Sequence, residues 1–457
     1  MILKPMIRNN ICINAHPLGC ARETERQIEY VVQRRSSYAK LAGPRAVLVL
    51  GCSTGYGLAT RIAAAFGFGA ATVGVSYEKE PSGNSTGTPG WYDNGAFDAA
   101  ATSDALPAIT INGDAFSAET KARVIAAARE LALRFDLVVY SLASPVRVDP
   151  ATGVMHRSVI KPIGGPYRGR TIDPFTKELS FVDVQAATEA EVGDTVKVMG
   201  GEDWELWIEA LASAGVLAPG AKTVAYSYVG PRMTWPIYRD GTIGRAKLHL
   251  EATAAKLPAA ADRAANAGEA GFSSLGLSAF VSINKALVTR ASAVIPVIPL
   301  YMSILFSVMK ERGIHEDCIA QMDRLFRERL YLGPAAGAIP LDEEGRIRLD
   351  ELEMGQAVQA EVEDRFRKIE ASNLTELADI DGFKGDFLRA HGFDVEEVDY
   401  SIEIDGQGRP VSDAPLGEDS GGRAARGSSP RKHQSEDEAL RLGSSRQDAS
   451  TNGGLIQ

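Results

Sequence analysis

The sequence contains few of the residues that build disulfide frameworks or metal centres. Among its 457 residues are four scattered cysteines, Cys12, Cys20, Cys52 and Cys318. They form no C-x-x-C pair, and the six histidines show no ligand spacing such as H-E-x-x-H. These absences argue against a disulfide scaffold, a dithiol redox couple and a zinc site, so we expect no metal in this protein.

Positive charge is also in short supply. Lysine and arginine number 49 against 59 aspartate and glutamate residues, which gives a net charge of -10. A chain of this charge lacks the basic surface that binds nucleic acid or an anionic membrane. The N-terminal segment has no apolar signal-peptide core, so we expect a cytoplasmic protein.

Long hydrophobic runs are almost absent. Residues 286–308 are apolar over 23 positions and carry one charge, Arg290. Pro296 and Pro299 interrupt this run, so it predicts a buried helix in place of a membrane span. Residues 406–457, in contrast, contain no aromatic side chain and are rich in Gly, Ser and charged residues. Such a segment cannot bury enough apolar surface to fold, and we predict a disordered tail.

The first half of the chain alternates between strand and helix patterns. Short apolar runs predict strands at residues 46–50, 71–77, 108–112, 137–142 and 223–229. Helical patterns follow at residues 58–66, 119–135, 189–199 and 203–214. This alternation predicts a doubly wound α/β fold around a parallel sheet.

A glycine-rich turn joins the first strand to the first helix. Gly51, Gly55 and Gly57 have the G-x3-G-x-G spacing of short-chain dehydrogenases/reductases. A dinucleotide needs glycine there because its pyrophosphate lies against the backbone and the N–H groups of the helix N-terminus. We therefore expect a dinucleotide cofactor at this turn.

Residues at the ends of the next strands indicate which dinucleotide binds. Glu78 ends the second strand, where a carboxylate accepts hydrogen bonds from ribose hydroxyls and repels a 2′-phosphate. This favours NAD(H) over NADP(H), although the adjacent Lys79 could accept a phosphate. Asp114, after the third strand, is placed to meet the adenine. Leu142 and Ala143, after the fourth, are placed to line the dinucleotide.

Tyr238 and Lys247 form a candidate catalytic pair after the fifth strand. A short-chain reductase needs a phenol that gives up a proton near pH 7. A nearby ammonium lowers the pKa of that phenol and binds the nicotinamide ribose. Eight residues separate the pair, where three are usual. Tyr228 is a candidate to bind a substrate carbonyl, but Tyr226 points the same way by alternation, and the residues alone leave both open.

The residues also leave the reaction open. The same tyrosine and lysine would protonate the alkoxide of a ketone or 3-oxoacyl reductase as well as the product of enoyl reduction. A dinucleotide-sensing protein without turnover is a third interpretation, and the intact pair of Tyr238 and Lys247 argues against it.

Longer motifs carry a resemblance to a known family. In chain order they read IRNNICINAHPLGC, VLVLGCSTGYGLATRIAAAFG, INGDAFS, VVYSLASPVR, VKVMGGEDWELWI, AYSYVGP, the 238–247 box and NKALVTRASAVIPVIPLY. On these, across residues 1–405, the chain closely resembles the trans-2-enoyl-CoA reductase family, which includes the FabV-type enoyl-acyl-carrier-protein reductases. The resemblance implies NADH-dependent reduction of trans-2-enoyl thioesters, such as crotonyl-CoA, in fatty acid synthesis. The carrier stays open between coenzyme A and acyl carrier protein.

The resemblance also implies an architecture. We expect a Rossmann-type sheet of the short-chain dehydrogenase/reductase kind, with added helices and no separate catalytic domain. An N-terminal hairpin cap is expected over residues 1–44, the dinucleotide-binding and catalytic core over 45–300, and a helical part of the same body over 301–405. The family implies a monomer.

Roles pass from the family to matching positions of this chain. Tyr238 matches the proton donor, Lys247 the cofactor-binding lysine, and Tyr228, in preference to Tyr226, the substrate-binding tyrosine. The matched NAD contacts are Gly51, Cys52, Ser53, Thr54, Gly55, Tyr56, Tyr77, Glu78, Asp114, Ala115, Leu142, Ala143, Lys247, Leu287, Val288 and Thr289. The last three would stand at the start of the apolar helix, which would line the acyl pocket.

Three departures limit the resemblance. Leu248 replaces a second lysine that many FabV-type members have, so any role of that lysine is absent here. Residues 254–280 form a longer stretch than the family shows, which leaves the register there open, and residues 406–457 have no counterpart. The candidates to bind the carrier phosphates are Arg147, Arg168 and Arg170.

Overall fold

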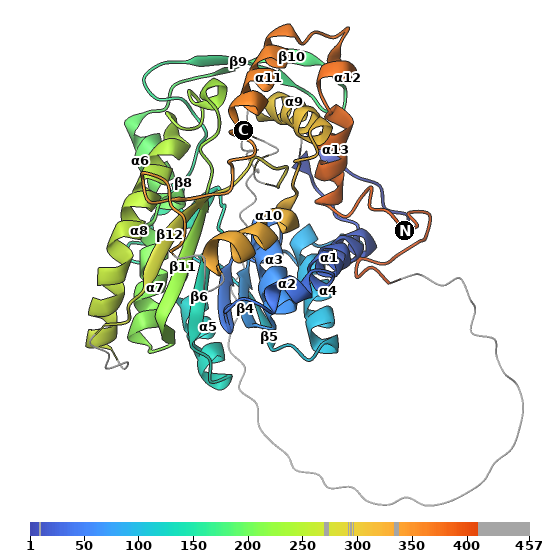
Figure 1. Cartoon of the computed structure of the whole chain (residues 1–457). Coiled ribbons are helices and arrows are strands. Elements are labelled where there is room, and N and C mark those ends of the chain that lie inside the picture. The colour runs from blue at the N-terminus through green and yellow to red at the C-terminus, as the bar shows by residue number, and fades with distance from the viewer. Residues whose placement is uncertain are drawn as a thin grey trace, which may run out of the picture. The chain divides into compact units, whose positions relative to one another are not determined.

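Buried apolar runs form a seven-stranded parallel sheet in the computed structural model (Figure 1). In spatial order its strands are β13 (Ile347–Arg348), β12 (Ser278–Ile283), β11 (Leu217–Ser227), β6 (Phe135–Tyr140), β3 (Ala46–Leu50), β4 (Ala71–Ser76) and β5 (Ala108–Asn112). All five predicted strands belong to this sheet, and the predicted α/β class is confirmed.

The structure describes residues 1–8, 11–268, 274–290, 292, 295, 297–332 and 338–409. Most of the predicted tail, from residue 410 onward, therefore lies outside the described residues. The domain boundaries expected at residues 44, 300 and 405 stay predictions. In the described part of the chain, every helix is too short or too polar to span a bilayer.

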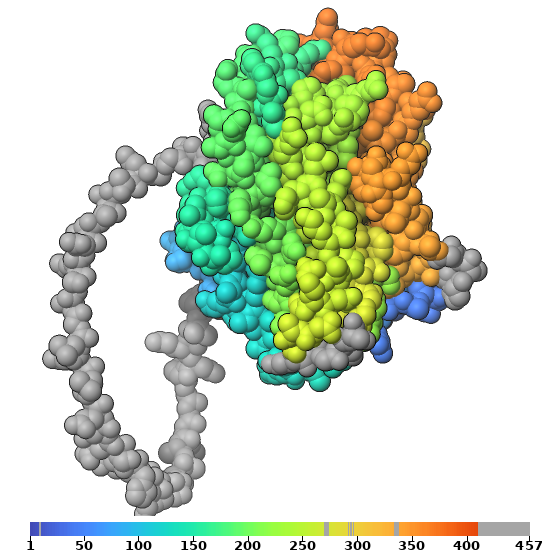
Figure 2. All heavy atoms as spheres, turned by 90° about the vertical axis from the view of Figure 1, so that its left-hand side faces the viewer, coloured from blue at the N-terminus to red at the C-terminus, as the bar shows by residue number. Residues whose placement is uncertain are grey.

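Alternating side chains of the central strands enter two separate cores. In β3, Leu48 and Leu50 pack with α5 (Ala118–Glu130), α7 (Glu202–Ser213) and α8 (Thr242–Ala267). Figure 2 shows this side of the protein, where α8 forms much of the yellow surface. Val47 and Val49 point the other way, toward α1 (Pro17–Val32), α3 (Gly55–Ile62), α4 (Pro89–Ser103) and α10 (Cys318–Leu325). Burial on both faces explains the continuous apolar runs of these strands.

A third core lies beyond the carboxyl ends of the strands, at the top of Figure 1. It contains α9 (Ile298–Glu311), α11 (Gln356–Lys368) and α13 (Ile380–Arg389), beside the hairpin of β9 (Tyr167–Ile172) and β10 (Leu179–Val184). Because ligands of doubly wound sheets bind at the carboxyl ends of the strands, this layer covers the expected site.

Shorter elements complete the fold. The N-terminal strands β1 (Ile7–Arg8) and β2 (Ile11–Cys12) form an antiparallel hairpin. The remaining elements are α2 (Arg35–Tyr38), η1 (Ala63–Gly67), β7 (Val146–Val148), β8 (Met155–Arg157), α6 (Glu189–Met199), η2 (Arg232–Thr234), η3 (Phe326–Leu330) and α12 (Leu374–Leu377).

Two predicted helices have different bounds in the structure. The apolar helix expected over residues 286–308 begins only at Ile298. Residues 284–289 form a loop after β12, so Leu287, Val288 and Thr289 do not start a helix, and the prediction that they do was wrong. Leu287 and Val288 are buried within the third core, which explains why this loop is apolar. The helix expected over 119–135 ends at Glu130, because the chain turns there into β6.

Candidate active site

The glycine turn after β3 brings backbones closer than any side chain would allow. Gly51 has a φ of +86°, and a Cβ on it would lie 2.2 Å from the carbonyl oxygen of Ser141. A Cβ on Gly57 would lie 1.7 Å from the carbonyl oxygen of Gly51. Thr54 precedes α3, and its side chain makes no capping hydrogen bond. The first-turn N–H groups therefore stay available, and together with the helix dipole they fit a pyrophosphate.

Glu78 is held as a fixed acceptor beside this turn. The hydroxyl of Ser53 donates to its Oε1 at 2.6 Å, and the hydroxyl of Thr88 donates to its Oε2. Nη1 of Arg290 lies 3.1 Å from Oε1. Only 6% of the Glu78 side chain is exposed, so the carboxylate is not a solvated charge at the end of a strand. Arg290 is a partner that no sequence pattern indicated.

The other expected cofactor residues differ in which groups they can present to a ligand. Tyr77 is 81% exposed, which leaves its ring free to meet a base. Asp114, in contrast, caps its own loop by accepting from the N–H of Phe116. Cys52 is fully buried, and burial raises the pKa of its thiol to about 11. Cys52 can therefore contribute only its backbone to a ligand.

Several of these residues converge on the glycine turn. A Cβ on Gly51 would lie 3.2 Å from Cδ2 of Leu142, and a Cβ on Gly55 would lie 3.5 Å from Cγ2 of Thr289. The loops after β6 and β12 therefore border the turn from two sides. Ala115 is buried, and its carbonyl oxygen accepts from Lys121 at 3.1 Å, so it faces the core.

Two tyrosines meet at the carboxyl end of β11. The rings of Tyr228 and Tyr238 stand edge to face, with centroids 5.0 Å apart. Burial raises the pKa of Tyr238, and the charge of Glu353 raises it further. This is opposite to the lowering expected from Lys247. It keeps the phenol protonated at neutral pH, as a proton donor must be.

The wide spacing between Tyr238 and Lys247 has a structural cause. Tyr238 lies in the turn before α8, whereas Lys247 lies in the second turn of that helix. The turn is tight, because a Cβ on Gly244 would lie 1.7 Å from the carbonyl oxygen of Arg239. Burial lowers the pKa of Lys247 to about 8, and its Nζ donates to the carbonyl oxygen of Tyr226 at 3.5 Å.

The choice between Tyr226 and Tyr228 also finds support in the geometry. The hydroxyl of Tyr226 lies 2.5 Å from the hydroxyl of Thr60 on α3, away from Tyr238. Tyr228 instead packs on Tyr238 and donates to Glu353 at 2.9 Å. Tyr228 is therefore the better placed of the two to share a substrate atom with Tyr238.

Sequence reasoning missed Glu353 and Tyr301. Glu353 is fully buried in the loop between β13 and α11, and Oε1 of Glu353 accepts from Tyr301 at 2.6 Å. Glu353 lies 125 residues from Tyr228 along the chain, and nothing in the surrounding acidic sequence separates it from a surface carboxylate. Tyr301 lies within the recognised apolar motif, which is the one signal that could have drawn attention to it.

A cavity of about 210 Å³ opens beside Tyr301 of α9. Its other lining residues are Val297, Met233, Thr234, Phe366, Phe181 and residues 167–170. The walls combine apolar side chains with Arg168 and Arg170, and Val297 and Tyr301 come from the segment that was expected to line an acyl pocket.

The three arginines considered for carrier phosphates are placed very differently. Arg147 is buried and pairs with Glu202 at 2.8 Å, so it cannot meet a carrier. Arg170 donates to the carbonyl oxygens of Phe366 and Ile369. Arg168, at the rim of the cavity, has a 66% exposed side chain and is the remaining candidate.

Three regions of the chain match described protein families. Residues 2–83 match "NAD(P)H binding domain of trans-2-enoyl-CoA reductase", and residues 85–331 match "Trans-2-enoyl-CoA reductase catalytic region". Residues 341–404 match "Enoyl reductase FAD binding domain". The first two regions contain the glycine turn and the paired tyrosines.

The name of the third region raises the question of whether a flavin fits there. Within residues 341–404, the structure has one two-residue strand, β13, and the helices α11, α12 and α13. The turn that joins β13 to α11 contains a single glycine, Gly355, and no glycine-rich motif, and α11 and α13 pack their apolar sides against α9. These residues lack the backbone cradle that a flavin dinucleotide pyrophosphate needs, so they do not fit the group.

The chain matches known relatives and a solved structure over nearly their whole length. The chain is 54% identical over 407 residues to "Trans-2-enoyl-CoA reductase [NADH]" of Treponema denticola, covering 89% of this chain and 99% of that protein. It is 48% identical to "Enoyl-[acyl-carrier-protein] reductase [NADH]" of Opitutus terrae, covering 89% and 98%. The crystal structure of the Treponema denticola enzyme in complex with NAD matches with a TM-score of 0.83, covering 88% of this chain and 98% of that one. With this likeness in sequence, fold and the regions that carry the site, the chain belongs to the trans-2-enoyl-CoA reductase family, which includes FabV-type enoyl-acyl-carrier-protein reductases.

Proposed function

We propose that the protein reduces trans-2-enoyl thioesters, such as crotonyl-CoA, to the saturated acyl thioesters with NADH. The observation that carries this proposal is the edge-to-face pair of Tyr228 and Tyr238, at the same edge of the parallel sheet as the glycine turn. The names of the relatives from Treponema denticola and Opitutus terrae support both NADH and an enoyl thioester.

Each residue has one role in the proposed reaction. NADH, when bound, supplies the hydride for the β-carbon of the substrate. Negative charge then builds on the thioester oxygen, and the hydroxyls of Tyr228 and Tyr238 stabilise it as donors. Tyr238 gives the proton, directly or through the enol, and Lys247 binds the ribose and steadies the phenol. Glu78 is the acceptor for the adenosine ribose, which favours NADH over NADPH.

We also propose the remaining cofactor contacts and the setting of the enzyme. The contacts are the backbone from Gly51 to Tyr56, Tyr77, Asp114, Ala115, Leu142, Ala143 and residues 287–289, of which the glycine turn and Thr289 are best supported. The enzyme would act as a cytoplasmic monomer in fatty acid synthesis. Its carrier would be coenzyme A or acyl carrier protein, with Arg168 as the candidate contact to a carrier phosphate.

The test is the consumption of NADH by the purified protein. Crotonyl-CoA, crotonyl-acyl-carrier-protein and acetoacetyl-CoA are each supplied with NADH and, in parallel, with NADPH. We expect rapid oxidation of NADH with an enoyl thioester, and much slower oxidation with NADPH or with acetoacetyl-CoA. Reduction of acetoacetyl-CoA alone would replace the proposal with a 3-oxoacyl reductase. NADH binding without turnover on any of the three would leave a cofactor-binding protein.

A further inference from the structure

The hydroxyl of Tyr228 has only one hydrogen, and the structure directs it away from a substrate. That hydrogen is donated to Oε1 of Glu353, which also accepts from Tyr301. Oε2 of Glu353 accepts from the backbone N–H of Ala286 at 2.7 Å. A carboxylate that receives three donors is well satisfied, but while it is charged it keeps the hydrogen of Tyr228 for itself.

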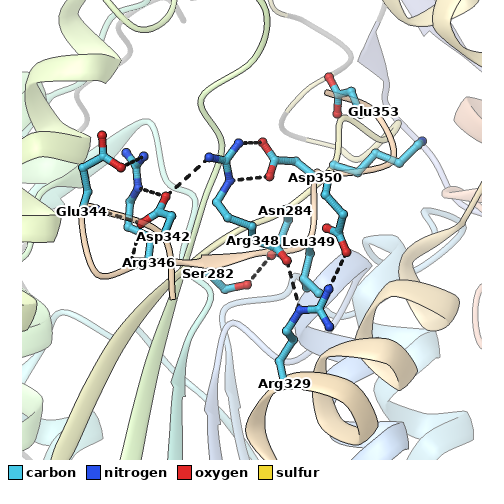
Figure 3. A network of polar contacts seen from close by, with 12 residues as sticks. Ser282, Asn284, Arg329, Asp342, Glu344, Arg346, Arg348, Leu349, Asp350 and Glu353 are labelled. Carbon is cyan, nitrogen blue, oxygen red and sulfur yellow. Dashed lines mark hydrogen bonds and ion pairs between the residues drawn. The ribbon is translucent and has the colours of Figure 1, made fainter. Parts of the chain in front are cut away.

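The loop that carries Glu353 is held firmly in place. The N–H of Leu349 donates to the carbonyl oxygen of Ile283 at 2.8 Å. Arg348 pairs with Asp350 at 2.7 Å, and Figure 3 shows this ion pair. Gln359 of α11 donates to the carbonyl oxygen of Glu353 at 2.8 Å. These contacts fix the backbone at Glu353, and its three donors hold the carboxyl group beside Tyr228.

Protonation of Glu353 would reverse the direction of the hydrogen bond. A carboxylic acid at this position can donate to the oxygen of Tyr228, which frees the phenol hydrogen for a thioester oxygen. It would also remove a negative charge close to the oxygen on which negative charge builds during the reaction.

Resting on the proposed function, we propose that Glu353 is a positioning residue for Tyr228. It holds the phenol beside Tyr238, and its proton decides whether the hydrogen of Tyr228 points into the loop or toward the substrate oxygen. Segment 341–404, whose family name suggests a flavin, would thus serve the reaction by placing this carboxyl group.

The surroundings of Glu353 set the sign of its pH dependence. Burial raises its pKa above the usual 4.5, while hydrogen bonds from Tyr301 and Ala286 and the charge of Lys285 oppose the rise. Asp350, on the same loop, adds to the rise, and the facing phenols of Tyr228, Tyr238 and Tyr56 are neutral. The protonated form of Glu353, which leaves the hydrogen of Tyr228 free for the substrate, therefore predominates at low pH. It is lost as the pH increases through the raised pKa of Glu353.

The central variant is Glu353→Gln, compared with the wild type by kcat/KM for crotonyl-CoA from pH 5 to 9. Because Ala286 needs an acceptor, the amide oxygen takes the place of Oε2 and the amide nitrogen donates to Tyr228 at every pH. The wild-type rate should fall with rising pH by up to roughly tenfold per unit above the pKa of Glu353, and the variant should lack this fall. Burial lowers the pKa of Lys247 to about 8, so loss of its charge should cause a second fall near pH 8 in both proteins.

Three further variants keep the outcome decisive. In Tyr301→Phe, the carboxylate loses a donor to its charged form, so the fall should move to higher pH. Glu351→Gln is the matched control: it changes a carboxylate of the same loop that pairs with Arg324 and Arg329, and the wild-type profile should persist. In Tyr228→Phe, the Glu353→Gln substitution should change kcat/KM much less than it does in the wild type, because only the removal of the Glu353 charge remains.

Thermal melting and NADH binding of each variant separate a folding defect from a change in the reaction. An unchanged fall in folded Glu353→Gln, or an effect of equal size in the wild type and in Tyr228→Phe, would overturn the role of Glu353. If the wild type did not reduce crotonyl-CoA or crotonyl-acyl-carrier-protein at all, the proposed function itself would fail, and the two failures are thus distinct.

Discussion

Tyr238 is buried and lies beside a second phenol, Tyr228, and both properties suit a proton donor. Its ring is packed against Tyr228, so its position depends on apolar contact as much as on its hydroxyl. The sequence could indicate Tyr238 and Lys247 because their types and order match a known chemistry. It could not indicate Glu353 or Arg290, because their partners come from distant segments and only the fold brings them together.

Substitution of Tyr238 by phenylalanine tests the proton donor. Because the ring contacts remain, the variant should fold and bind NADH as the wild type does. Turnover of crotonyl-CoA should fall by about 10²–10⁴-fold, the usual effect of losing a general acid. The matched control is Tyr226→Phe, whose hydroxyl meets Thr60 instead of the pocket, and it should retain turnover. Near-normal turnover in Tyr238→Phe would remove this residue from the mechanism.

Substitution of Glu78 by glutamine tests the basis of cofactor choice. The amide would no longer repel a 2′-phosphate, and Arg290, which is 3.1 Å from the carboxylate, would become free to pair with it. A charge-assisted hydrogen bond contributes about 1.5–3 kcal/mol, so the ratio of kcat/KM for NADPH to that for NADH should rise about tenfold or more. Glu80→Gln, at an exposed position two residues later, should leave the ratio unchanged, and an equal change in both variants would contradict the role of Glu78.

At the scale of elements, prediction succeeded where burial on both faces leaves a simple pattern. The run at β3 matches its predicted bounds because every residue in a central parallel strand favours apolar side chains. The bounds of β5 also match, although β5 lies at the edge of the sheet and is mostly half-buried. The same reasoning was wrong for residues 286–289, where part of an apolar run forms a loop that precedes α9. The hairpin of β9 and β10 consists mostly of exposed and half-buried residues and has no such apolar run that would predict it.

The junction of β3 and α3 gives a prediction at this scale. Gly57→Ala would place a Cβ 1.7 Å from a backbone oxygen, which forces the helix away from the turn. Overpacking of this kind costs about 1–3 kcal/mol of unfolding free energy, and NADH affinity should fall with it. Gly95→Ala, in α4, is the control: its Cβ meets nothing within 4 Å, so helix propensity should stabilise the protein by about 0.5–1 kcal/mol. Denaturant unfolding and NADH titration measure both effects.

At the scale of the whole molecule, the expected cofactor site joins segments that are far apart in sequence. The turn after β3, Glu78 after β4, the loop after β6 and residues 287–289 after β12 all border it. The sequence predicts the class of fold because the connections between strands follow simple rules. The position of the third core and of Glu353 depends on packing between distant segments, which the sequence does not reveal. Resemblance to a family supplied the enoyl thioester substrate and the preference for Tyr228 over Tyr226, which local patterns left open.

This arrangement predicts strong stabilisation by NADH. A ligand at 100 times its Kd adds about 2.7 kcal/mol to the free energy of unfolding, which corresponds to an increase in Tm of several degrees. Thermal scans of the wild type and of Tyr238→Phe should show the same increase, while Gly57→Ala should show little. An increase retained in full by Gly57→Ala would place the cofactor elsewhere.

Transfer of an isotopic label tests the central claim most directly. The protein is incubated with crotonyl-CoA and NADH deuterated at the transferred position of the nicotinamide, and the product is examined by mass spectrometry and NMR. The account predicts butyryl-CoA with one deuterium, on the β-carbon, and a proton from water on the α-carbon. A product without deuterium, or deuterium at any carbon other than the β-carbon, would contradict it.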